Sequence, residues 1–231
     1  MEIEITGKTF DGRQVLGQIS LTIPPGTTVA LTGPSGIGKS TLARIVAGID
    51  PSFEGILTGV GRIGMVFQEP TLLPWRSAIA NIRISTGCDE KSARDALDQV
   101  ELGDRTTAFP GQLSLGQQRR VALARALAAN PDTLILDEAF ASLDDPTAAR
   151  MRALTRQILE NSTFCTLLVT HNLQDVVELA DSVLLLDGKP AEILARHTIS
   201  TPLAERQANA ELDRIQQHLH PQNNATEIPL A

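Results

Sequence analysis

Residues 33–41 read Gly-Pro-Ser-Gly-Ile-Gly-Lys-Ser-Thr and satisfy the pattern G-x-x-x-x-G-K-[ST]. Residues 28–32 (TVALT), just before, are rich in β-forming residues, and residues 40–47 (STLARIVA), just after, suit a helix. Glycines in such a loop let backbone N–H groups turn toward an anion, and the helix N-terminus adds the positive end of its dipole. The stretch therefore predicts a phosphate-binding loop. A glycine-rich turn that only joins two core elements is the alternative.

The same stretch assigns roles to single residues. Lys39 is placed to reach the β- and γ-phosphates of a nucleotide, and the Ser40 hydroxyl is placed to ligate Mg²⁺. We expect the whole segment to bind the nucleotide: Gly33, Pro34, Ser35, Gly36, Ile37, Gly38, Lys39, Ser40 and Thr41.

Composition narrows the class of protein. The 231 residues are 42% hydrophobic, enough for one large domain with a sizeable core. The net charge of −7 and the lack of a strong basic stripe argue against a nucleic-acid partner. Two isolated cysteines favour a reduced, cytosolic chain. We see neither a signal peptide nor an apolar stretch of membrane-spanning length, so work at a membrane would need another chain.

Apolar runs at residues 63–67, 133–136 and 165–169 are typical of buried strands and alternate with helical patterns. This alternation indicates a mostly parallel sheet covered on both faces. Between the last two runs we expect a helix, capped by Asp145 with Pro146 at its first position.

Residues 71–130 differ in character, because they lack β-rich runs and show helical periodicity. We expect a helical insertion there, with one apolar face formed by Ala93, Ala96, Leu97 and Val100. Farther on, a last helix is expected over about residues 202–218, and a disordered tail over 219–231.

Residues 134–138 (LILDE) predict an apolar strand that ends in two acids. Acids at the carboxyl end of a buried strand can meet a ligand there. Asp137 suits a Mg²⁺ site, directly or through water, and Glu138 can polarise an attacking water as general base. A solvated pair of acids at a strand end is the alternative, which the phosphate-binding loop disfavours.

Residues 113–120 (LSLGQQRR) precede an Ala/Leu-rich helix that runs to about residue 129. Ser114 is a natural N-cap for this helix. Its hydroxyl, the free N–H groups behind it and Gly116 would form a second anion site. An ordinary capped helix is the alternative.

Taken in order, these motifs resemble the set found in ABC-type ATPases, over nearly the whole chain. Residues 113–117 are similar to the family signature Leu-Ser-Gly-Gly-Gln, with Leu115 at the middle glycine. Residues 141–144 (ASLD) resemble the D-loop, usually Ser-Ala-Leu-Asp, so only Leu143 and Asp144 match in place. Ala139 stands where the family often has proline.

The resemblance implies a fold. It is an α/β fold, with a RecA-like P-loop NTPase core, an N-terminal antiparallel β subdomain and a helical insertion. A single domain would cover residues 1–218. The β subdomain and core would occupy residues 1–70 and 131–200, and the helical subdomain residues 71–130.

The resemblance also implies roles for residues whose types alone leave the matter open. Gln68 would be the Q-loop glutamine, which senses Mg²⁺ and the γ-phosphate; His171 would be the switch histidine at the γ-phosphate; and Phe10 would stack on adenine. The catalytic set is then Lys39, Gln68, Glu138 and His171, and the metal set is Ser40, Gln68 and Asp137. A structural histidine and a core phenylalanine are the alternatives for His171 and Phe10. Ser114, Gly116, Gln117 and Asp144 join the nucleotide-binding residues, and the cofactors are ATP and Mg²⁺.

In this family two cassettes associate head-to-tail, so one chain presents Ser114 and Gly116 to the ATP of the other. The implied partners are a second cassette, in a homodimer, an integral membrane permease and an extracytoplasmic solute-binding protein. The chain would lie at the cytoplasmic side of the inner membrane, held there by the permease.

Residues 71–76 (TLLPWR) resemble the matching segment in the cassettes of importers for nitrate, taurine, alkanesulfonates and thiamine precursors. They begin the helical insertion, where such importers dock the permease, although Trp75 could simply fill the core. Three other classes stay open: an exporter cassette, a soluble single cassette in cofactor assembly, and a P-loop kinase. The kinase would not need the motif at residues 113–120 or His171.

Overall fold

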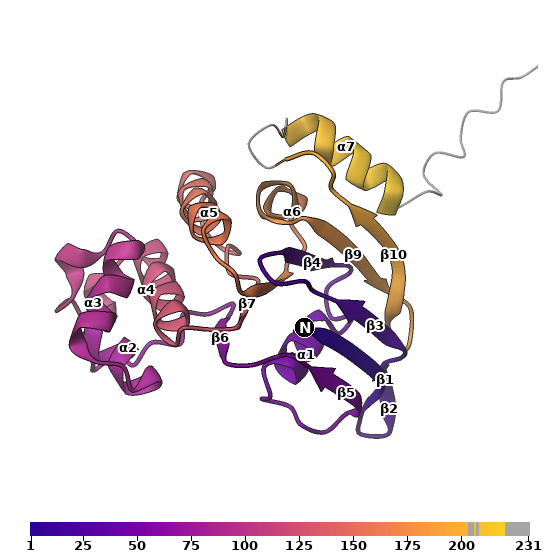
Figure 1. Ribbon diagram of the computed structural model, residues 1–231, viewed down its shortest axis with the longest axis horizontal. Coiled ribbons are helices and arrows are strands. Elements are labelled where there is room, and N and C mark those ends of the chain that lie inside the picture. Colours follow the sequence, from indigo (N-terminus) through magenta and orange to yellow (C-terminus); the bar gives the residue numbers. More distant parts are fainter. Residues whose placement is uncertain (203–205, 207, 220–231) are drawn as a thin grey trace, which may run out of the picture.

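The computed structural model describes residues 1–202, 206 and 208–219. A six-stranded sheet in the order β10-β9-β4-β8-β7-β6 forms its centre (Figure 1). Only β10 runs antiparallel to its neighbour, and the other pairs are parallel. These strands are β4 (Thr28–Thr32), β6 (Ile63–Val66), β7 (Thr133–Asp137), β8 (Cys165–Val169), β9 (Ser182–Asp187) and β10 (Glu192–Thr198). The predicted parallel sheet is therefore confirmed.

The central strands are buried on both faces. Every residue of β4, β7 and β8 is buried, and successive side chains enter two different cores. On β8, for example, Leu167 and Val169 join one core and Leu168 joins the other. Because side chains alternate along a strand and both faces are covered, these runs are mainly apolar, which is why they stand out in the sequence.

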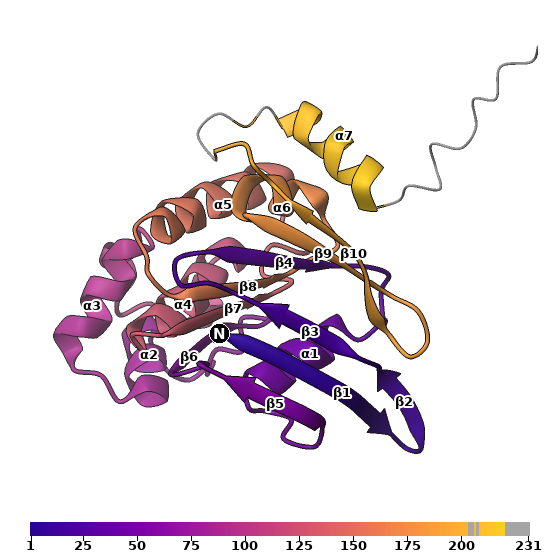
Figure 2. The ribbon, with the colours of Figure 1, turned by 45° about the vertical axis from the view of Figure 1, so that its right-hand side comes forward.

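A second, antiparallel sheet packs on the core that contains Leu167 and Val169 (Figure 2). Its strands are β1 (Glu2–Phe10), β2 (Arg13–Leu16), β3 (Ile19–Thr22) and β5 (Glu54–Thr58). Strand β1 pairs with the other three. Ile3 and Ile5 of β1 share a core with Leu42 and Ile45 of α1 (Lys39–Val46), so α1 packs between the two sheets. The expected N-terminal antiparallel β unit is present.

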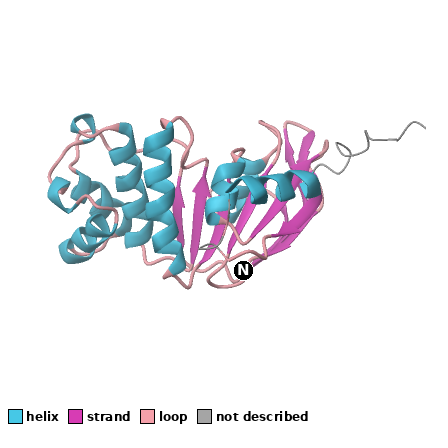
Figure 3. Ribbon diagram, turned by 90° about the horizontal axis from the view of Figure 1, so that it is seen from above, coloured by secondary structure: helices cyan, strands magenta, loops and turns pink. Residues whose placement is uncertain are grey.

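The remaining helices cover the opposite face of the six-stranded sheet or form a cluster at one end (Figure 3). They are α2 (Ala78–Thr86), α3 (Glu90–Gln99), α4 (Leu115–Ala128), α5 (Asp145–Glu160), α6 (Leu173–Leu179) and α7 (Ala208–Leu219), with 3-10 turns η1 (Gly103–Arg105) and η2 (Pro110–Gln112). Residues 71–130, all of them described, contain helices and no strand, as expected. The predicted apolar face of α3 and its C-cap is buried.

Three sequence expectations need correction. The N-cap of α5 is Asp144, not Asp145, because the Asp144 carboxylate accepts the Thr147 N–H at 3.2 Å. The described part of the last helix begins at residue 208, later than the expected 202. Leu219, placed in the tail, is buried within α7, while residues 220–231 lie outside the described part of the chain.

Among the described residues, no helix combines the length and apolarity that crossing a bilayer requires.

The core predicts a clear contrast between two isoleucines. Ile135 on β7 is 0% exposed, whereas Ile56 on β5 is 64% exposed. We expect Ile135→Ala to lower the free energy of unfolding by about 2–5 kcal/mol, because it leaves a cavity in a close-packed core. Ile56→Ala should change it by less than about 0.5 kcal/mol. Urea unfolding followed by circular dichroism measures both, and equal losses would contradict this description of the core.

Candidate active site

The predicted phosphate-binding loop connects β4 to α1 and depends on two glycines. Gly33 has a φ of 145°, and a Cβ there would lie 2.2 Å from the Leu186 carbonyl oxygen. Gly38, the N-cap of α1, has a φ of 121°, and a Cβ there would lie 2.6 Å from the Leu16 side chain. Both the conformation and the space therefore require glycine. The loop ends at a helix N-terminus, where unpaired N–H groups favour an anion.

Lys39 is buried and folds back over the loop. Its Nζ donates to the carbonyl oxygens of Gly33 at 2.8 Å and Pro34 at 2.9 Å. Burial lowers the pKa of the Lys39 ammonium, and the carboxylates of Glu138 and Asp137 oppose that shift. The Lys39 ammonium is thus held over the loop, at the place where the phosphate oxygens of a nucleotide would bind.

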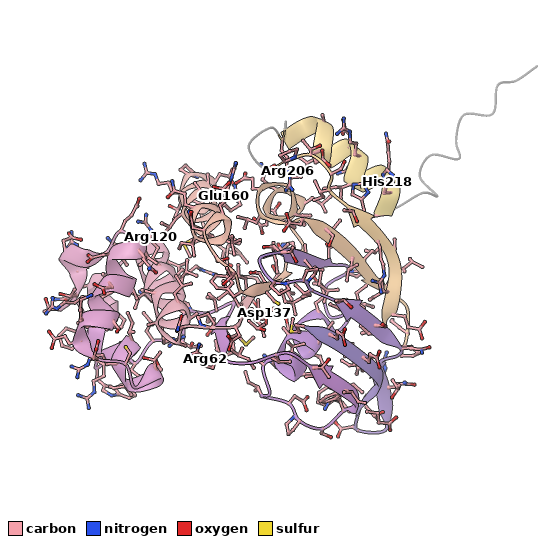
Figure 4. The ribbon with its side chains drawn as sticks, in the orientation of Figure 1. Arg62, Arg120, Asp137, Glu160, Arg206 and His218 are labelled. Atoms are coloured by element: carbon pink, nitrogen blue, oxygen red, sulfur yellow. The ribbon has the colours of Figure 1, made fainter. Side chains whose placement is uncertain are left out.

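The two acids lie where β7 ends, beside the loop. Asp137 is buried and accepts a hydrogen bond from the Ser40 hydroxyl at 2.9 Å. Burial raises the pKa of Asp137, and the bond from Ser40 opposes the rise. Figure 4 labels Asp137 near the middle of the molecule, at the end of β7. A hydroxyl and a carboxylate at this spacing are the hard oxygen ligands that Mg²⁺ prefers, so the residues present fit that ion.

Glu138 leaves the strand in an unusual conformation. Its φ is 50°, which is rare for a residue with a side chain. Its N–H donates to the Val169 carbonyl oxygen at 2.9 Å, and its carboxylate lies 2.8 Å from His171 Nδ1. The ends of β7 and β8 therefore bring Glu138 and His171 together, although 33 positions separate them.

These groups surround one cavity of about 380 Å³, lined by Ser35, Gly36, Gly38, Lys39, Ser40, Thr41, Gln68, Glu138 and His171. The catalytic set expected from the sequence thus converges on a single space. A carboxylate, an imidazole, an ammonium and a hydroxyl around a phosphate-binding loop can position a triphosphate and a water for hydrolysis.

Other expected residues lie outside this cavity. Pro34 and Ile37 line a neighbouring hollow of about 690 Å³ with Arg13, Ser35, Gly36, Asp187, Gly188 and Lys189. Phe10 is 46% exposed, and the Lys8 ammonium lies 4.3 Å from its ring centroid. That exposure excludes a core role for Phe10 and leaves its ring accessible to a planar ligand.

The residues at the start of α4 also lie apart from the cavity. Ser114 caps the helix, as expected: its hydroxyl accepts the Gln117 N–H, and the Gln117 side chain accepts the Ser114 N–H at 2.9 Å. Gly116 packs against α5, and a Cβ there would lie 2.5 Å from Thr147 Cγ2. Asp144 caps α5 next to this contact. The first turns of α4 and α5 therefore lie side by side.

Sequence reasoning missed two arginines on α4. Arg125 donates to the carbonyl oxygens of Pro70 and Thr71, and so holds the segment that follows Gln68. Arg119 is buried against the turn that begins at Glu138. The available signal was the Ala- and Leu-rich sequence of the helix that carries them, because such a helix is mostly buried. Trp75, in contrast, is 67% exposed, which excludes the core-filling alternative.

The fold and the cavity together define a P-loop nucleoside triphosphatase with a helical insertion. A family model described as "ABC transporter" matches residues 16–141. Aliphatic sulfonates import ATP-binding protein SsuB 1 of Xanthomonas axonopodis pv. citri is 40% identical, and the alignment covers 95% of this chain and 94% of that protein. SsuB 3 of Nocardia farcinica is 45% identical, with 80% and 76% covered.

Among solved structures, the chain is similar to the ATP-binding cassette MJ0796 in a dimeric post-hydrolysis state bound to ADP and Pi. The TM-score is 0.75 at 27% identity, with 87% of this chain and 99% of that chain covered. This chain therefore belongs to the ABC transporter family. It is an ATP-binding, ATP-hydrolysing subunit of the ABC type.

The contact between Gly116 and Thr147 makes a testable prediction. Gly116→Ala should lower the free energy of unfolding by about 1–3 kcal/mol, because the new methyl overlaps the Thr147 methyl. Thr147→Ser removes that methyl and keeps the hydroxyl, so the double variant should recover most of the loss. Chemical denaturation of the two single variants and the double variant tests this. A double variant as unstable as Gly116→Ala would contradict it.

Proposed function

We propose that this chain is the ATPase subunit of an importer of aliphatic sulfonates. The observation that carries the proposal is the 40% identity to a sulfonate import subunit over nearly the full length of both chains. The relatives are named for aliphatic sulfonates, a class that includes taurine. This favours a sulfonate over nitrate and over thiamine precursors, the other solutes suggested by residues 71–76.

The proposed site follows from the cavity. The loop at residues 33–41 holds the phosphates of ATP, Lys39 neutralises their charge, and Ser40, Asp137 and Gln68 hold Mg²⁺, which shields the phosphate charge when bound. Glu138 takes a proton from the attacking water. His171, whose Nδ1 lies 2.8 Å from the Glu138 carboxylate, orients that carboxylate. Two observations support these assignments: the hydrogen bond between Ser40 and the buried Asp137, and the cavity that Lys39, Gln68, Glu138 and His171 line together.

A second cassette completes the proposed site. Ser114, Gly116 and Gln117 lie at a helix start outside the cavity of their own chain. Ser114 is exposed there, so this helix start is free to meet the ATP of another chain, although Gly116 is itself buried against α5. Phe10, also outside, would stack on the adenine. The dimeric cassettes among the similar structures support a dimer, and we propose that it is a head-to-tail homodimer.

A membrane permease is the second proposed partner, with a solute-binding protein outside the membrane, and the chain at the cytoplasmic side of the inner membrane. The exposed Trp75 and a groove that includes Thr71 of the same segment support the permease contact. That groove, of about 280 Å³, is lined by residues of β6, α2 and α4 and by Phe67, Thr71 and Ala129. An exposed aromatic side chain and a groove are both features that a helix of a partner can use.

The test is capture of the assembly. Tagged Glu138→Gln is expressed in its native host, membranes are solubilised with Mg-ATP, and bound chains are identified by mass spectrometry. We expect a multi-span permease. Trp75→Ala, which leaves the ATP site intact, should recover much less of it. The accompanying solute-binding protein is then titrated with an alkanesulfonate, taurine and nitrate. Recovery of soluble partners alone would contradict the transporter assignment and favour a cassette for cofactor assembly.

A further inference from the structure

A buried arginine links the start of α4 to the catalytic turn. Arg119 is only 3% exposed, and its guanidinium donates to three backbone carbonyl oxygens. They are those of Glu138 at 3.3 Å, Ala139 at 2.7 Å and Ala141. No side chain is among these acceptors, so the arginine binds the path of the backbone between residues 138 and 141.

That backbone path needs support. Glu138 and Ser142 both have positive φ values, 50° and 62°, although neither is glycine. Such conformations persist where the surroundings over-determine them, and they cluster at active sites. The turn itself supplies only the bond from Ala141 N–H to the Glu138 carbonyl, and β8 adds the one from Glu138 N–H to Val169. The Arg119 fork, which reaches three carbonyls at once, is the largest single constraint from outside.

We propose that Arg119 is a positioning residue for Glu138: it fixes the turn that aims the carboxylate at the ATP cavity. The inference rests on the proposed role of Glu138 as general base. A planar fork with several donors suits this task, whereas a lysine ammonium on a flexible stem reaches fewer acceptors in fixed directions.

The position of Arg119 on α4 connects the start of that helix with the Glu138 turn. Arg119 lies little more than one helical turn beyond Ser114, the residue proposed to meet the ATP of the partner cassette. Gly116 lies between them and packs against Thr147. Thr147 is in the first turn of α5, the helix that follows the Glu138 turn. A shift of α4 on contact with the partner's ATP would therefore move the Glu138 turn of its own chain. The two ATP sites of a dimer would sense each other through this arginine.

The experiment compares Arg119→Met with the parent chain under saturating Mg-ATP. Methionine keeps most of the buried volume and removes every donor. We expect kcat to fall about 10- to 100-fold, as for a misplaced catalytic group, and the Kd for ATP to change less than about threefold. Arg119→Lys should lose less than Arg119→Met. Arg156→Met removes a guanidinium that pairs with Glu160 on α5 and should leave kcat unchanged. An unaltered kcat in Arg119→Met would overturn the proposal.

A double-variant cycle separates positioning from a general structural role. In the Glu138→Gln background, Arg119→Met should slow residual single-turnover hydrolysis by less than about twofold, because the group it positions is already disabled. A full additional loss would overturn the proposal. If Glu138→Gln itself stays active, the assignment of the base fails independently of Arg119. If Arg119→Met does not fold, Arg119→Lys provides the same cycle, and parent-like kcat in that variant would overturn the inference.

Discussion

Glu138→Gln is expected to keep ATP binding and to lose nearly all turnover. The amide keeps the size of the side chain and a hydrogen bond to His171, 2.8 Å away in the parent, but it cannot accept a proton from water. Removal of a general base costs about 10²- to 10⁴-fold in rate. Phosphate release under single-turnover conditions measures the loss, and a fluorescent ATP analogue measures binding.

The matched control for this variant is Glu101→Gln. Glu101 is exposed and pairs with Arg120 of α4 at 3.0 Å. The same change of charge and shape there should leave turnover within about twofold. Undiminished hydrolysis in Glu138→Gln would show that another group accepts the proton.

Lys39→Ala is expected to lower the rate of ATP hydrolysis by about 10³-fold or more and to weaken ATP binding. Two effects combine. The alanine leaves the phosphates without the cation placed for them, and it removes the bonds that hold Gly33 and Pro34 in the loop. Loss of one preorganised donor alone costs about 10²- to 10³-fold in kcat. Steady-state phosphate release and titration with a fluorescent ATP analogue test this.

Lys91→Ala serves as the control, because it removes the same charge from an exposed helical pair with Asp95. It should change neither ATP binding nor turnover measurably. Tight ATP binding that survives in Lys39→Ala would mean that the backbone of the loop, rather than the ammonium, dominates recognition.

Several features of the fold were predictable because their physical cause is local. Strands buried on both faces need mainly apolar runs, so β4, β7 and β8 were visible in the sequence. Ser114 was identified as an N-cap by its residue type and by the helix that follows. The positions of β5 and β10 were not predicted, since β10 has polar and apolar residues on half-exposed faces and β5 lies at an edge.

Where two local choices were equivalent, the sequence could not decide. Asp144 and Asp145 both suit an N-cap, and only the backbone direction, extended at Asp144, selects the first. The contacts of Arg119 and Arg125 were equally hidden. Arginine is usually exposed, and each of these side chains finds its acceptors on segments distant in sequence, 19 or more positions away for Arg119.

The sequence by itself determined the phosphate-binding loop, the pair of acids, the buried strands, the helical insertion and the family, because glycine spacing, apolar runs and caps act over a few residues. Only the tertiary structure decided how these parts meet. The adjacent ends of β7 and β8 bring His171 to Glu138, the close approach at Gly116 joins α4 to α5, and the buried Arg119 joins α4 to the turn after β7. These contacts depend on parallel pairing between distant strands and on burial, which no local pattern records.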